Sequence, residues 1–101
     1  MKAFSVTLTS ADTNYNIGAL IKAIAPTFYD QGRQVMIQSN TANTAPILIG
    51  DVNLGTSRYG LELTAALSSV NLGSAPLMVR LQEYYARSTG AAQILNITIL
   101  Y

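Results

Sequence analysis

Residues 92–101 read AQILNITILY, and the pattern of this segment decides the fold class. Leu95, Ile97 and Ile99 alternate with polar side chains. Successive side chains of a strand point to opposite faces, so a period of two predicts a strand with one apolar, buried face. The β-branched residues of the segment favour the same conformation.

The same alternation recurs along the chain, with polar turns in between. It is found in residues 4–9, 33–39, 46–50, 59–64 and 84–88, and more weakly in residues 65–72. Short strands at spacings of about 8–12 residues are typical of an antiparallel sandwich or barrel. We therefore predict an all-β fold in which residues 1–101 form a single, small antiparallel β-sandwich or jelly-roll-like domain.

One segment has a helical period instead. Between residues 17 and 24 the apolar side chains recur at i, i+3, i+4 and i+7, which predicts one short amphipathic helix. Asn14 or Asn16 can cap its start by accepting a backbone N–H, and Pro26 ends it. We expect this helix to close one end of the β core. A second, shorter helical turn is expected over residues 81–83.

The composition indicates that the protein associates with partners. Half of the residues are hydrophobic and 11% are charged, whereas soluble domains usually carry about 25% charged residues. No apolar run approaches the roughly 18 residues that span a bilayer, and the opening MKAFSVTLTSAD lacks the apolar core of a secretory signal. We therefore expect self-association and no membrane partner.

Composition also argues against several kinds of chemistry. The net charge of +1 comes from charges spread singly along the chain, so we expect no nucleic-acid partner. Histidine and cysteine are absent, which removes the usual bases, thiolate nucleophiles and soft metal ligands. No two carboxylates stand in a recognisable motif. We expect a protein that is not an enzyme, with no catalytic residue, metal site or cofactor.

The turn between residues 50 and 60 is the best candidate for a ligand loop. It contains Gly50, Asp51 and Gly60, but it lacks the Lys-Ser/Thr pair of a phosphate loop and the further carboxylates of a calcium loop. An aspartate in such a turn commonly accepts backbone N–H groups. We predict a structural turn in which Gly50 lets the chain bend and Asp51 satisfies backbone donors.

An interface is expected on the outer side of the last strand. Ile94 and Leu100 lie on the face opposite Leu95, where water would not favour them. Tyr84 and Tyr85 are adjacent in a predicted strand and must face opposite sides. We expect one of these tyrosines to join Ile94 and Leu100 in a contact with another protein.

Together these segments resemble a family of small tailed-bacteriophage virion proteins, the β-sandwich decoration or cement proteins of the head. The resemblance covers nearly the whole chain and is most specific in TANTAPILIGD…YGLEL. The matching segments are FSVTLT (4–9), TNYNIGALIKAI (13–24), VMIQSNTANTAPILIGD (35–51), YGLELT (59–64), VRLQEYYARS (79–88) and AAQILNITILY (91–101). Residues 65–68, Ala-Ala-Leu-Ser, depart from it, because a turn with proline or glycine is expected there.

The resemblance implies a structural role. Such a protein would be made in the host cytoplasm, assemble as a symmetric oligomer (a homotrimer), and bind the major capsid protein on the exterior of the virion. The alternative is a receptor- or glycan-binding module of a phage fibre or tail, which would carry an exposed aromatic cluster.

Overall fold

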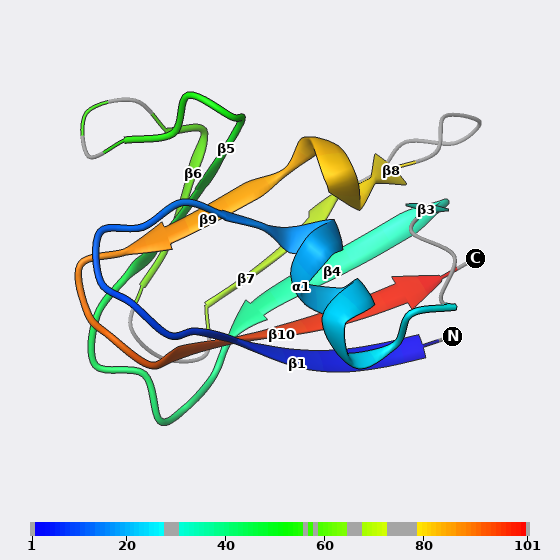
Figure 1. Ribbon diagram of the computed structural model, residues 1–101, viewed down its shortest axis with the longest axis horizontal. Coiled ribbons are helices and arrows are strands. Elements are labelled where there is room, and N and C mark those ends of the chain that lie inside the picture. The colour runs from blue at the N-terminus through cyan, green and yellow to red at the C-terminus, as the bar shows by residue number, and fades with distance from the viewer. Residues whose placement is uncertain are drawn as a thin grey trace.

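The computed structural model describes residues 2–27, 31–55, 57, 59–64, 68–72 and 79–100. Two four-stranded antiparallel sheets form a sandwich around one core (Figure 1). Sheet A has the order β1 (Lys2–Leu8), β10 (Gln93–Leu100), β4 (Gln34–Ser39), β7 (Ser69–Leu72). Sheet B has the order β2 (Tyr15–Asn16), β9 (Tyr85–Ser88), β5 (Ile47–Gly50), β6 (Leu61–Leu63). A two-stranded pair, β3 (Gln31–Gly32) with β8 (Val79–Arg80), completes the described strands.

The last strand, β10, lies inside sheet A. It pairs with β1 on one side and with β4 on the other, so that Ile97 stands between Phe4 and Ile37. In this register Leu95, Ile97 and Ile99 all point into the sandwich and are fully buried. The alternation of the last segment therefore has the predicted effect.

Both sheets contribute to the same core. Its members are aliphatic and come from alternate positions of the strands, as the period of two requires. They are Val6, Leu8, Val35, Ile37, Leu95, Ile97 and Ile99 from sheet A and Ile47, Ile49, Leu63 and Ala86 from sheet B, with Ile17, Ile21, Val79 and Leu81 from other segments. The predicted antiparallel β-sandwich with one short helix is confirmed.

The helix α1 (Ile17–Ile24) contacts β1 of sheet A, β2 of sheet B and the 3₁₀ turn η1 (Leu81–Glu83). Asn16 caps it, since its Oδ1 accepts a hydrogen bond of 2.9 Å from the amide of Ala19. The predicted apolar stripe holds for its first turns only: Ile17 and Ile21 are buried, but Ile24 is 59% exposed.

The strand predictions place the major elements within two residues of their observed ends. The short strands β2, β3 and β8 were not predicted, because two residues are too few for a periodic pattern. Of the weak strand predicted over residues 65–72, the second half is observed as β7. Residues 65–67 and the last residue of the chain lie outside the described part. None of the described helices is long and apolar enough to cross a membrane.

Candidate interaction surface

The outer face of sheet A is the most unusual surface of the described structure, because its side chains carry no charge. We call it the neutral face. It consists of the outward side chains of alternate residues that pair in rows across the four strands. They are Ala3, Ser5 and Thr7 from β1, Ile94, Asn96, Thr98 and Leu100 from β10, Gln34, Met36 and Gln38 from β4, and Ser69 and Asn71 from β7.

The polar groups of the neutral face are hydroxyls and carboxamides. Ser5 Oγ donates a hydrogen bond of 2.8 Å to Asn96 Oδ1 between neighbouring strands. Hydroxyls accept as well as donate, and each carboxamide has one accepting oxygen and two donating N–H groups. The face can therefore form hydrogen bonds with almost any polar surface without bringing an ion out of water.

Apolar side chains interrupt these polar rows. Met36 is 41% exposed and Leu100 is 40% exposed, while Ile94 is half-buried. Met36 and Leu100 border a shallow hollow of about 150 Å³, which Gln34, Asn71 and Thr98 complete. A second hollow of about 350 Å³ lies around Ser5, Asn40 and Asn96. The neutral face thus offers apolar contact area and relief into which a partner could pack.

The described charged residues all lie elsewhere. Those on the outer face of sheet B are Glu62 and Arg87, which flank Leu48 in one row across β6, β5 and β9. The others lie at strand ends, in turns or on the helices: Lys2, Asp12, Lys22, Arg33, Asp51, Arg80 and Glu83. The two outer faces of the sandwich therefore differ sharply in charge.

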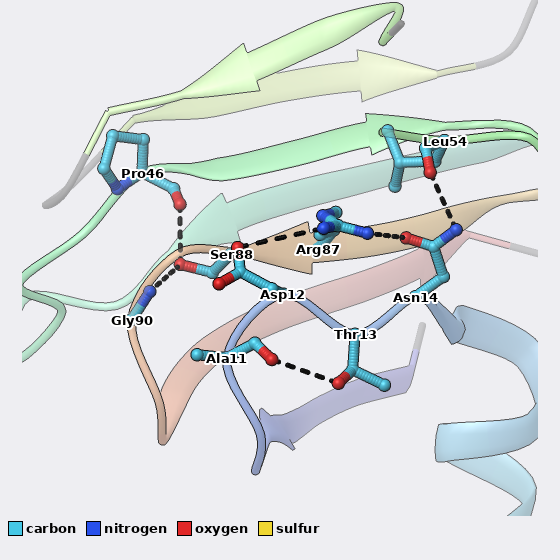
Figure 2. A network of polar contacts seen from close by, with 9 residues as sticks. All are labelled: Ala11, Asp12, Thr13, Asn14, Pro46, Leu54, Arg87, Ser88 and Gly90. Carbon is cyan, nitrogen blue, oxygen red and sulfur yellow. Dashed lines mark hydrogen bonds and ion pairs between the residues drawn. The ribbon is translucent and has the colours of Figure 1, made fainter. Parts of the chain in front are cut away.

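Arg87 has a structural role on the outer face of sheet B (Figure 2). Its Nη1 donates to Asn14 Oδ1 over 3.3 Å, and its Nη2 lies 3.8 Å from Asp12 Oδ1. Asn14 in turn donates from Nδ2 to the carbonyl of Leu54 over 2.8 Å. The backbone amide of Asp12, a residue with φ of 54°, donates to Ser88 O over 2.7 Å. The guanidinium thereby ties the loop of Asp12 and Asn14 to β9, and Asn14 connects this loop to Leu54.

The turn after β5 has the predicted internal hydrogen bond. Asp51 Oδ1 accepts from the amide of Asn53 over 2.9 Å, and the amide of Gly60 donates to Ile49 O over 2.9 Å. The reason for Gly50 differs from the prediction. Its φ lies outside the left-handed region, and a Cβ there would come within 3.0 Å of Leu54 Cδ1. A side chain at position 50 would therefore require Leu54 to shift slightly, and the bend itself does not depend on a left-handed backbone.

This turn also borders a hollow of about 270 Å³, lined by Gly50, Asp51, Tyr59 and Gly60. Among the described residues that line it, Asp51 is the one carboxylate. The described part of the chain contains no group of three or more histidine, cysteine, aspartate or glutamate residues that could hold a metal ion.

The residues predicted to form one interface lie in different parts of the fold. Ile94 and Leu100 lie together on the neutral face. Tyr85 belongs to β9 of sheet B, opposite Gly50 and Asn16, and Tyr84 packs against the core. Neither tyrosine can join Ile94 and Leu100 in one flat contact. The prediction placed both tyrosines in one strand, but Tyr84 follows η1 and precedes the first residue of β9.

Sequence reasoning missed Met36 and the uncharged rows beside it. The signal was present in β4, where Gln34, Met36 and Gln38 alternate with buried residues, but only the strand order shows that these rows are continuous with Thr98 and Asn96. Comparisons of the chain with protein-family models, with curated proteins and with solved structures find no match.

Proposed function

We propose that this chain is a non-enzymatic structural protein of a bacteriophage virion, a capsid decoration or cement protein. It self-associates and binds the major capsid protein on the exterior of the head. The observation that carries the proposal is the neutral face, a four-stranded surface without charge in a chain of which only 11% is charged. The sequence resemblance supports the same role.

The side chains of the neutral face favour its burial in a permanent contact over its exposure to water. Removing an ion from water costs much free energy unless the ion is well paired in the contact. Amides and hydroxyls, in contrast, can exchange water for protein hydrogen-bond partners with little net change in free energy. Met36 and Leu100 add apolar area that is favourable to bury. The side chains of this face also offer no acid, base or thiolate for catalysis.

A decoration protein needs only a modest contact per copy, because the icosahedral shell repeats it many times. The homotrimer implied by the resemblance would place the neutral face of one copy against a different patch of its neighbour. A two-fold pair would place the face on itself. Either arrangement removes the neutral face from water.

The alternative role, a glycan-binding module of a fibre or tail, would use exposed aromatic rings. Among the described residues Tyr59 is the one exposed aromatic side chain, at 46%. It lies between the hollow beside Gly50 and a second hollow of about 200 Å³ that Pro46, Leu48, Glu62 and Thr89 also line. One ring at a shallow surface offers less stacking area than the cluster that this role predicts.

Immunogold labelling tests the proposal directly. An antibody raised against the purified chain is applied to gradient-purified virus particles from the culture that carries the gene. The proposal predicts gold on the outside of intact heads, together with the chain in the mass-spectrometric inventory of the particles. Gold confined to tails or fibres would favour the alternative, and particles that lack the chain would contradict both.

A further inference from the structure

We infer that the neutral face packs against the neutral face of a second copy of this chain, around a two-fold axis. This inference rests on the proposed use of the face as a contact surface and names its occupant. The pair would stack two sheets A face to face, with both sheets B turned outward.

Charge is the first argument. Around a two-fold axis the same patch meets itself, so a charged residue near the axis faces its own copy and repels it. The neutral face has no such residue. Its hydroxyls and carboxamides accept and donate, so they can bond to copies of themselves. A partner with charged groups, in contrast, would lose water from its ions on this face and gain no counter-charge.

The positions of the charged residues also favour a second copy of this chain as the partner. Glu62 and Arg87 lie on the opposite side of the sandwich and stay in water when two sheets A meet. The paired form would therefore expose the charged surface and bury the uncharged one. The few charges of the chain are then sufficient, because the uncharged face no longer has to be exposed to water.

The area of the face is that of a small interface. Its four strands have 7, 8, 6 and 4 residues, and each residue occupies about 3.4 Å along its strand and about 4.8 Å across it. The face thus covers roughly 400 Å² per copy, or ~800 Å² for two, which corresponds to a weak, reversible pair. Met36 and Leu100 would interdigitate with the facing sheet, because stacked sheets lie about 10 Å apart.

Gln38 is the best position for a test. It lies on β4, one of the two inner strands of the face, beside Asn96 on β10 and Ser69 on β7, and its side chain points outward. Gln38→Glu keeps the shape of the side chain and adds a negative charge. Gln38→Lys adds a positive charge. In a two-fold pair each variant places like charges near one another, whereas a mixture of the two variants places opposite charges there.

The experiment is native mass spectrometry with sedimentation velocity on the full chain, with one variant labelled with ¹⁵N. We expect a wild-type dimer, at least tenfold weaker pairing of each variant alone, and recovery in the mixture as a mixed dimer. The same exchanges at Gln82, an exposed residue of η1, serve as the control and should leave the dimer unchanged. Ser69→Glu with Ser69→Lys repeats the test at an exposed site if a Gln38 variant fails to fold.

A wild-type monomer or trimer, or a mixture that does not recover the dimer, would overturn this inference. A dimer that both Gln38 variants keep at wild-type strength would overturn it as well. None of these results changes the labelling of virus particles, so failure here is distinguishable from failure of the proposed function.

Discussion

Asn43 and Ile94 exchange two hydrogen bonds between a side chain and a strand. Asn43 Nδ2 donates to the carbonyl of Ile94 over 2.8 Å, and the amide of Ile94 donates to Asn43 Oδ1 over 2.7 Å. Asn43 is 8% exposed. Its carboxamide therefore continues the β4–β10 ladder beyond the pair of Leu95 and Ser39 and ties the polar loop after β4 to the central strand.

Replacing Asn43 by Asp should destabilise the fold. The carboxylate keeps the acceptor for the Ile94 amide but loses the donor, and its charge faces the Ile94 carbonyl in a buried position. The Ile94 carbonyl keeps its second hydrogen bond, from the Asn40 amide at 3.2 Å. The substitution therefore costs the one lost hydrogen bond, about 1 kcal/mol of unfolding free energy, and the buried charge adds to that cost. Urea denaturation measures the change. Asn53→Asp, at an exposed turn position, is the matched control, and equal midpoints for the two variants would contradict this account.

Asp51→Ala should lower stability without removing an activity. The substitution deletes the acceptor of the Asn53 amide in the turn after β5, and one such hydrogen bond contributes about 1 kcal/mol. Glu62→Ala removes another exposed carboxylate and serves as the control. If Asp51→Ala instead abolished turnover of a substrate at an unchanged melting temperature, the turn would be a catalytic site and not a structural one.

Tyr15 should ionise earlier than an ordinary tyrosine. Hydrogen bonds with the side chain of Thr9, at 2.8 Å, and from the amide of Ser10, at 2.9 Å, lower the pKa of its hydroxyl. Because the unfolded chain keeps this proton up to a pKa of about 10, the contribution of Tyr15 to stability rises with pH between the lowered and the unfolded pKa.

Absorbance at 295 nm reports the ionisation of tyrosines. The titration of the folded protein should contain an early step that Tyr15→Phe removes, while Tyr59→Phe, at an exposed ring, leaves it in place. An identical early step in wild type and Tyr15→Phe would show that the two hydrogen bonds do not act on the hydroxyl in solution.

Local patterns predicted the sandwich well because its long strands and its helix each have a regular period. The cap by Asn16 and the burial of Leu95, Ile97 and Ile99 follow from positions within a few residues. Features that depend on distant segments were not predictable in this way. Asn43, for example, bonds to Ile94, which lies 51 residues further along the chain.

The candidate surface was predicted in part for the same reason. Ile94 and Leu100 stand out within one strand, but Met36 and the uncharged rows become one face only through the order β1-β10-β4-β7. One of the two tyrosines was predicted to join this contact, because the place of residues 84 and 85 in the fold does not follow from their local pattern. Strand order was the missing information.

The central claim is that the neutral face is buried between copies of this chain, and sedimentation equilibrium of wild type and Leu100→Lys tests it most directly. Ile94→Lys repeats the change at the other end of β10, and Leu48→Lys, on the outer face of sheet B, is the matched control. An unpaired lysine in a dry contact costs on the order of 3 kcal/mol per site. We predict a wild-type mass that is a multiple of 10.8 kDa, the same mass for Leu48→Lys, and monomers with an unchanged far-UV spectrum for Leu100→Lys. A monomeric wild type, or an assembly that Leu100→Lys leaves intact, would contradict the claim.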